Sequence, residues 1–187
     1  FSTETPIPTG PGVYRIGKHQ ISDIKDYGVL SFSGVLIKSS NVGTAKIALE
    51  LAPEELYRTL SAVGFGQVSG VELPGEVDGS LVKRERWRPI EHATLSYGYG
   101  LASTQVQLAR AYSVLASGGI LRPVTLRQRS ASVPGQRVLS RATVQQINLL
   151  LEKVVSAEGT AKNAAVPAYR VAGKTGTVHK VSSSGGY

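Results

Sequence analysis

The sequence contains no cysteine and no methionine among its 187 residues. The missing cysteine excludes a disulfide framework, a thiol nucleophile and thiolate metal sites. It suits a protein that works outside the cytoplasm, although many cytosolic proteins also lack cysteine. Because methionine is absent and the chain starts at Phe1, we expect an internal segment of a longer protein. No run approaches the roughly 18 apolar residues of a membrane span, and no signal peptide is recognisable, so these residues say nothing about an anchor.

The composition, 41% hydrophobic and 18% charged, is that of an ordinary globular chain long enough for one domain or a large part of one. Its net charge of +8 is compatible with nucleic acid, an anionic membrane or an anionic polymer as a partner. The densest basic run, residues 83–88, includes Trp87. Because no zinc-finger spacing or RNP-like motif accompanies it, we interpret the run as a solvated loop before a helix and expect no nucleic-acid partner.

The three histidines, His19, His92 and His179, are scattered and have no carboxylate at ligand spacing. We therefore interpret them as surface or packing residues. We expect neither a metal nor an organic cofactor.

Apolar spacing and capping residues predict the secondary structure. The first dozen residues should be loop, Val13–Ile16 a strand, and the chain from Ser33 helical with an interruption at Ser39-Ser40-Asn41. Further helices should begin at Pro53 and end at Gly64, begin at Thr104 and end at Gly118, and begin at Ser140. The last of these should carry an apolar stripe at helical spacing, made of Val144, Ile147, Leu150, Leu151, Val154 and Val155. The helix that begins at Thr104 should be amphipathic and bury one face, which consists of Leu108, Ala109, Tyr112, Leu115 and Ala116.

The regions between the helices are less regular. Residues 64–100 are rich in glycine and should be a long irregular segment, Val124–Arg127 should be extended, and a short alanine-rich helix or turn should follow Gly159. Residues 169–178 should form a strand. Helices followed by a late strand predict an α+β fold, with a helical lobe beside an antiparallel sheet that is incomplete within these residues.

Two triplets carry chemistry. On a strand, Lys174-Thr175-Gly176 would place an ammonium and a hydroxyl beside a glycine whose missing side chain leaves room for a ligand to approach the backbone. A substrate carboxylate could then bind to Lys174, Thr175 and Thr177. Ser39-Ser40-Asn41 is an S-x-N triplet that could supply a proton-relaying hydroxyl and an amide for a substrate carbonyl. Each triplet also has a structural interpretation without chemistry. Lys174-Thr175-Gly176 could be part of an ordinary edge strand, and Ser39-Ser40-Asn41 could be a helix cap or a polar turn.

In this order, 135 residues apart (174 − 39), the triplets resemble two of the three signatures of penicillin-reactive serine acyltransferases. Further segments resemble class B penicillin-binding proteins, above all the septal transpeptidases of Gram-negative bacteria: residues 38–43, 96–101, 107–112, 118–123 and 170–177. The resemblance extends from about Ile21 onward. It implies a penicillin-binding, serine β-lactamase-like fold, with residues 1–187 forming part of a single transpeptidase domain.

The third signature, S-x-x-K, carries the nucleophile and should begin a helix well before Ser39. The string Ser22–Lys25 starts only 17 residues earlier (39 − 22) and no helical pattern follows it, while Ser80–Lys83 comes after S-x-N. We interpret both as chance matches. The nucleophilic serine is then absent, and we expect this segment alone to turn over no substrate and to form no covalent penicillin adduct.

For the intact enzyme the resemblance implies acyl transfer between peptidoglycan stem peptides, with β-lactams as covalent inhibitors. Ser39 would pass a proton, Asn41 would hold the substrate amide, and Lys174 would attract the terminal carboxylate. The remaining implied binding residues are Thr175, Gly176 and Thr177, and the cleft-wall tyrosines Tyr97 and Tyr99, for which plain packing is the alternative. The implied location is the periplasm, with an N-terminal inner-membrane anchor and division-complex partners.

Two alternatives remain. A β-lactamase or penicillin-sensing domain would share the fold, but a class A hydrolase needs a glutamate base, and Glu76, Glu91 and Glu152 do not lie in that family's loop pattern. A non-catalytic module that binds wall polymer or other proteins would use the positive charge and the exposed loops instead.

Overall fold

The structure is a computed structural model that describes residues 1–128, 130–131 and 133–176. Its helices are α1 (Phe32–Lys38), α2 (Asn41–Leu49), α3 (Pro53–Ala62), α4 (Pro89–Leu95), α5 (Gln105–Ala116) and α6 (Arg141–Val155), with 3₁₀ turns η1 (Arg84–Arg86) and η2 (Lys162–Ala164). Its strands are β1 (Pro6–Pro8), β2 (Val13–Ile16), β3 (His19–Ser22), β4 (Val29–Ser31), β5 (Ser80–Leu81), β6 (Leu101–Ala102), β7 (Ile120–Leu121) and β8 (Gln136–Arg137). Of the helices in these ranges, none has the length and apolarity needed to cross a bilayer.

The strands pair antiparallel as β1–β4, β2–β3, β5–β6 and β7–β8. The predicted strand at Val13–Ile16 is confirmed and forms a hairpin with β3 through Gly17 and Lys18. The prediction of loop for the first dozen residues is wrong at β1, where Ile7 is buried and pairs with Leu30. This pairing is set by distant residues, which local turn signals do not report.

The helices around the S-x-N triplet form as predicted. Ser39 ends α1 in the left-handed conformation with φ 58°, and the side chain of Ser40 caps α2. Gly43 lets the two helices approach, because a Cβ there would lie 2.6 Å from a methyl of Val35. The helix at Pro53 is also confirmed, and Gly64 follows its end with φ +105°.

Helix α4 corrects the prediction that residues 64–100 are irregular. Pro89 occupies its first turn, and Glu91 accepts a hydrogen bond from the backbone N–H of Arg88 at 2.8 Å, which is the half of a capping box that a glutamate at this position supplies. The preceding basic run was predicted to be a loop before a helix, and the helix is present. The run packs on the fold, since the ring of Trp87 lies against Tyr57 and His92.

Helix α5 begins after Thr104 as predicted, but its predicted buried face is wrong. Leu108 and Tyr112 are 47% and 45% exposed, whereas Gln107 and Val114 are fully buried. Burial of Gln107 is tolerated because its amide donates to the carbonyls of residues 67 and 78, at 2.7 and 2.8 Å. Hydrophobic spacing cannot anticipate a buried polar side chain whose partners lie in distant loops.

Helix α6 is confirmed and buries most of its predicted apolar stripe, while η2 supplies the predicted turn after Gly159. Two extended segments are corrected. Residues 124–127 form no ladder and bend at the last two, and residues 169–176 form no strand. A strand takes its hydrogen bonds from another strand, but here the N–H of Gly173 donates to the carbonyl of Leu151 in α6, at 3.2 Å.

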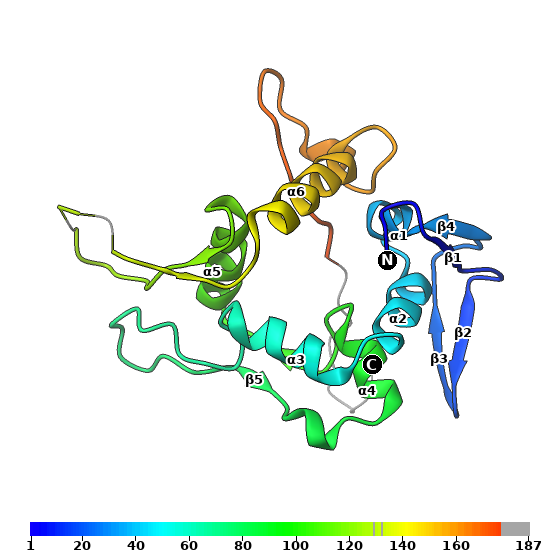
Figure 1. Cartoon of the computed structure of the whole chain (residues 1–187), viewed down its shortest axis with the longest axis horizontal. Coiled ribbons are helices and arrows are strands. Elements are labelled where there is room, and N and C mark those ends of the chain that lie inside the picture. The colour runs from blue at the N-terminus through cyan, green and yellow to red at the C-terminus, as the bar shows by residue number, and fades with distance from the viewer. Residues whose placement is uncertain (129, 132, 177–187) are drawn as a thin grey trace.

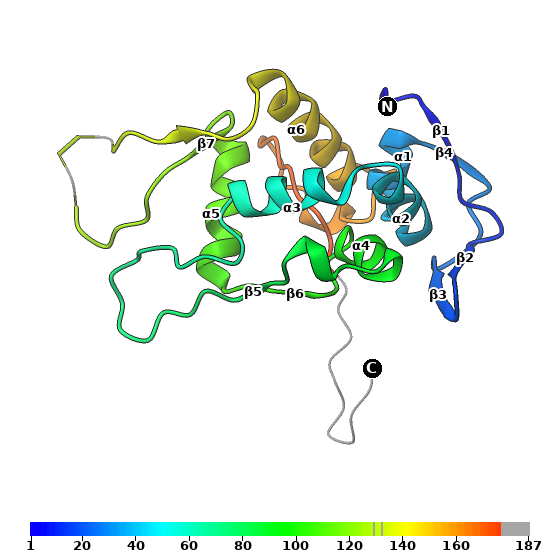
Figure 2. The same cartoon turned by 60° about the horizontal axis from the view of Figure 1, so that its bottom comes forward.

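The helices surround the middle of the molecule, and the segment that follows η2 runs down between them (Figures 1 and 2). A buried cluster joins the β2–β3 hairpin to α2 and α4, and consists of Ile21, Val42, Ala45 and Ala93. Six helices with short antiparallel ladders confirm the α+β class for the described residues.

Candidate functional site

The S-x-N triplet is a tight turn between two helices whose outer serine is exposed and whose middle serine is buried. Ser40 is 1% exposed, and its hydroxyl donates to Asp23 Oδ2 at 2.6 Å while accepting from the N–H of Gly43 at 2.9 Å. Asp23 Oδ1 accepts from the N–H of Val42 at 3.0 Å. The carboxylate therefore fixes the first turn of α2, where negative charge is also favoured by the helix dipole. This arrangement leaves Ser39 free to face outward.

Asn41, the third member of the triplet, is held by the neighbouring hairpin. Its side-chain Nδ2 donates to the backbone carbonyl of Ser22 at 3.2 Å. One further hydrogen and the amide oxygen of Asn41 therefore have capacity for a ligand.

The structure brings the K-T-G triplet against the S-x-N turn. Lys174 Nζ donates to Ser39 Oγ at 2.7 Å and to the carbonyl of Thr175 at 3.2 Å. The hydroxyl of Thr175 lies 2.9 Å from that of Thr160. At Gly176, no described atom lies within 4 Å of the position that a Cβ would occupy, so the space beside the backbone is open. Thr177 lies outside the described residues.

Partial burial lowers the pKa of Lys174 below the usual value for lysine, because desolvation disfavours the ammonium. A lysine with a lowered pKa exchanges its proton more readily with a hydroxyl partner. The Ser39–Lys174 contact can therefore both present positive charge and support a proton relay.

The residues just before the K-T-G triplet are bonded to α6 through Arg170. Arg170 makes a two-point contact with Glu152, with Nη2 at 2.7 Å and Nε at 3.3 Å from the carboxylate oxygens. On the other side, Lys38 Nζ donates to the carbonyl of Glu158 at 2.7 Å. These contacts tie α1, α6 and the segment together, which supports the position of Lys174.

Tyr97 and Tyr99 stand edge to face, with ring centroids 5.8 Å apart. Both line a cleft of about 690 Å³ that also contains Asn41. Tyr97 additionally packs on the buried hairpin cluster, and its burial raises the pKa of its hydroxyl. Tyr97 thus combines the two interpretations, packing and cleft wall.

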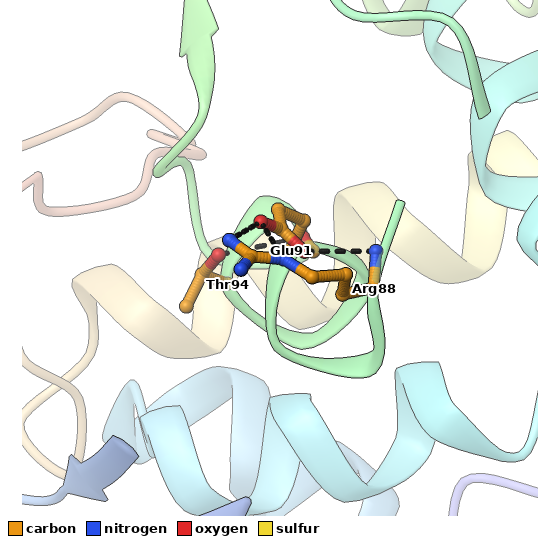
Figure 3. A network of polar contacts seen from close by, with 3 residues as sticks. All are labelled: Arg88, Glu91 and Thr94. Atoms are coloured by element: carbon orange, nitrogen blue, oxygen red, sulfur yellow. Dashed lines mark hydrogen bonds and ion pairs between the residues drawn. The ribbon is translucent and has the colours of Figure 1, made fainter. Parts of the chain in front are cut away.

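Arg88 and Glu91 form an ion pair on the rim of the same cleft (Figure 3). Arg88 Nε lies 2.7 Å from Glu91 Oε1, and this interaction lowers the pKa of Glu91 and raises that of Arg88. Thr94, one turn further along α4, donates to the carbonyl of Glu91 at 3.3 Å.

Sequence reasoning missed Asp23, Thr160 and the Arg88–Glu91 pair. Asp23 lies inside the first S-x-x-K string, where the motif drew attention to Ser22 and Lys25 instead. The only signal for Arg88 and Glu91 was the capping pattern around Pro89.

The two S-x-x-K strings lie outside helices. Ser22 ends β3, and Ser80 begins β5. The motif needs its serine at the start of a helix, and neither Ser22 nor Ser80 lies there. This agrees with the interpretation that both strings match the motif by chance, and that interpretation stays a prediction. Within the described ranges no cluster of three or more histidine or carboxylate side chains could hold a metal.

A family model described as "Penicillin binding protein transpeptidase domain" matches residues 1–187. The chain is 42% identical over 174 residues to the peptidoglycan D,D-transpeptidase FtsI of Escherichia coli K12, covering 93% of this chain and 30% of that protein. It is 38% identical to the probable peptidoglycan D,D-transpeptidase PenA of Neisseria meningitidis, covering 89% of this chain and 29% of that protein. The chain thus spans about 30% of the length of these relatives.

Among solved structures, the apo transpeptidase domain of Burkholderia pseudomallei penicillin-binding protein 3 superposes with a TM-score of 0.92 at 44% identity. The match covers 98% of this chain and 56% of that one. A peptidoglycan glycosyltransferase from Burkholderia ambifaria gives 0.90 at 40% identity, covering 96% of this chain and 57% of that one.

Proposed function

The chain belongs to the penicillin-binding protein transpeptidase family, and from this premise we propose that it forms part of a serine-type peptidoglycan D,D-transpeptidase. Residues 1–187 are one part of a single transpeptidase domain that cross-links stem peptides during septal wall synthesis and is acylated by β-lactams. The observation that carries the proposal is the 2.7 Å contact between Lys174 Nζ and Ser39 Oγ, which joins the two triplets across 135 residues.

In the first step, a serine outside these residues attacks the carbonyl of a D-Ala-D-Ala terminus, and the peptide C–N bond breaks to release D-alanine. The leaving nitrogen needs a proton. Ser39 is placed to deliver one, because its hydroxyl is hydrogen-bonded to the half-buried Lys174. Lys174 supplies positive potential for the terminal carboxylate.

Other residues hold the substrate in place. Asn41 uses its remaining amide capacity for the substrate's amide, and the hydroxyls of Thr175 and Thr177 bind the carboxylate. The open space at Gly176 admits the substrate beside the backbone. Tyr97 and Tyr99 form one wall of the cleft.

In the second step, an amine of a neighbouring stem peptide attacks the acyl-enzyme ester, the serine leaves, and a new amide cross-link forms. The backbone N–H of Thr177 and that of the nucleophilic serine stabilise the oxyanion in both steps. Each such donor typically contributes about 3 kcal/mol to the transition state.

A hydrolytic β-lactamase is the second candidate, and the carboxylates argue against it. Glu76 accepts from the N–H groups of Ser69 and Gly70, at 2.6 and 3.1 Å, and these bonds lower its pKa. The pKa of Glu91 is lowered too, and Glu152 is paired with Arg170. A carboxylate with a lowered pKa or a bound guanidinium is a poor general base for deacylation.

The similarity to FtsI supports a place in cell division. We infer that the enzyme works in the periplasm, held to the inner membrane by an N-terminal helix, and assembles with other division proteins. Its substrates are peptidoglycan stem peptides.

The proposal is tested by labelling the full-length protein with a fluorescent penicillin. The wild type should be labelled, and Lys174→Ala should slow labelling strongly. Lys18→Ala, at the exposed hairpin turn, is the matched control and should label normally. Absence of labelling in the wild type, or equal labelling of all three proteins, would refute the proposal.

A further inference from the structure

Residues 92–151 carry most of the positive charge of the chain. They contain six arginines but no lysine, aspartate or glutamate, and they therefore supply +6 of the net charge of +8. In the rest of the chain, basic and acidic residues nearly balance. The excess is local, and its arginines are Arg110, Arg122, Arg127, Arg129, Arg137 and Arg141. Of these, Arg129 lies outside the described residues.

Three of the arginines lie on one projecting arm. The β7–β8 arm consists of β7, β8 and the described residues between them, which are 122–128, 130–131 and 133–135. It lies beside the loop of residues 66–79, at the end of the molecule opposite the β2–β3 hairpin (Figures 1 and 2). Arg127 Nε lies 3.7 Å from Glu72 Oε2, so the arm and the loop are neighbours.

The base of the arm is held by two arginines that act within the fold. Arg137 Nη1 donates to the carbonyls of Gly118 and Leu139, at 2.8 and 3.1 Å. Arg110 Nε, in α5, donates to the carbonyl of Arg122 at 3.3 Å. These hydrogen bonds position the start of the arm and leave two other guanidinium groups for a ligand.

Those two groups belong to Arg122 and Arg127. Among the described residues, the guanidinium of Arg122 has no hydrogen bond or ion pair. The side chain of Arg127 is 82% exposed, and its contact with Glu72 is weak because water screens it. Of the other acids in the loop, Glu76 is bound to two backbone N–H groups, and Asp78 lies at the end next to β5.

Exposed apolar side chains accompany these charges. Leu126, next to Arg127, is 63% exposed, and Val68, Leu73 and Val77 in the loop are each more than half exposed. Burial of such side chains against a partner is favourable. Exposed apolar residues among polar and charged ones are typical of interaction sites.

The use of arginine alone indicates the chemistry of the partner. A guanidinium presents parallel N–H groups that match the two oxygens of a carboxylate, and protein interfaces are enriched in arginine and depleted in lysine. An anionic bilayer attracts arginine and lysine alike, so it gives no reason for the absence of lysine from residues 92–151. A protein segment with carboxylates and apolar side chains accounts for both the arginines and the exposed apolar residues.

We propose that the β7–β8 arm and the neighbouring loop form a docking surface for an acidic segment of another protein. Carboxylates of this segment pair with Arg122 and Arg127, and its apolar side chains cover Leu126. The β2–β3 hairpin, which contributes β3 to the cleft beside Asn41, lies at the opposite end of the molecule, so a bound segment leaves that cleft open (Figure 1). The inference goes beyond the proposed function and does not depend on it.

The test is photo-crosslinking of the full-length protein in living cells, with a photoreactive amino acid in place of Leu126. Illumination should join this position to a peptide of another protein, and mass spectrometry should show that the peptide is rich in aspartate and glutamate. The same photoreactive amino acid in place of Val13, an exposed residue of β2 at the opposite end, is the control and should not capture that peptide.

Two double variants locate the recognition. Arg122→Gln combined with Arg127→Gln should reduce the yield of the crosslink about tenfold, because two charge-assisted contacts are lost. Arg15→Gln combined with Arg86→Gln removes the same charge from exposed positions outside the docking surface and should leave the yield unchanged. Both double variants should melt at the wild-type temperature, which separates a loss of binding from a loss of folding.

The outcomes are distinguishable. Capture of an acidic peptide in a yield that depends on Arg122 and Arg127 supports the docking surface. Capture of a lipid, of a second copy of this chain or of a segment without acidic residues overturns it, as does the absence of any crosslink or an equal yield in the two double variants. A wild type that fluorescent penicillin does not label refutes the proposed function and leaves the docking surface standing.

Discussion

Replacing Asp23 with alanine should loosen the S-x-N turn. Asp23 accepts two hydrogen bonds, from the buried hydroxyl of Ser40 at 2.6 Å and from the N–H of Val42 at 3.0 Å. Charge-assisted hydrogen bonds contribute about 1.5–3 kcal/mol each, and two on one carboxylate are not additive, so we expect a loss of about 2–4 kcal/mol. Asp23→Asn should cost less, because its amide oxygen can still accept from Val42 while its NH₂ group cannot accept from Ser40.

Hydrogen exchange of the full-length protein, followed by mass spectrometry on peptides covering residues 39–45, reads this loss directly. A local loss of about 2 kcal/mol accelerates exchange about thirtyfold. Asp26→Ala is the control, since Asp26 makes a single exposed bond to the N–H of Gly28 at 2.8 Å. If Asp23→Ala accelerated exchange no more than Asp26→Ala, the carboxylate would not hold the turn.

Two further predictions concern stability. His92 stacks on Trp87, and its burial lowers the pKa of its imidazole. The folded state therefore binds a proton less readily than the unfolded state. The stability that His92 contributes to the folded state is fully present above the unfolded pKa of about 6.5 and is lost as the pH falls toward the folded pKa. The melting temperature should therefore fall between pH 7 and 5 less steeply in His92→Gln, and an unchanged slope would contradict this. Gly79→Ala should cost about 2 kcal/mol or more, because φ is +67° and the new Cβ would lie 2.3 Å from the Ala102 carbonyl oxygen. Gly75→Ala, with φ +78° and open space, should cost only about 1 kcal/mol in the same thermal melts, and equal losses would refute the steric argument.

Much of the helical part could be predicted because local signals and tertiary packing agree there. Ser140 caps α6, and the stripe that includes Val144 and Val154 is buried as its spacing predicts. The resemblance to penicillin-binding transpeptidases, and with it the fold, is confirmed by the family match and by the superposition on the Burkholderia pseudomallei domain.

Two of the failures have the same physical cause, because the structure there depends on partners that are distant in the sequence. Ile7 forms a strand only because Leu30 pairs with it, and Gln107 is buried only because distant carbonyls accept from its amide. The strand predicted at residues 169–178 has no ladder in its described part, residues 169–176. At the site, the sequence singled out Ser39 and Lys174 but could not show that Asp23 orients the turn.

The most direct measurement is a double-mutant cycle on Ser39 and Lys174. Second-order rate constants for acylation by a fluorescent penicillin would be measured in the full-length wild type, Ser39→Ala, Lys174→Ala and the double variant. Because the two side chains are in contact at 2.7 Å and act on one proton in the proposed mechanism, the double variant should lose little more than the worse single variant. Losses that multiply independently would contradict the claim that the S-x-N turn and the K-T-G segment form one site.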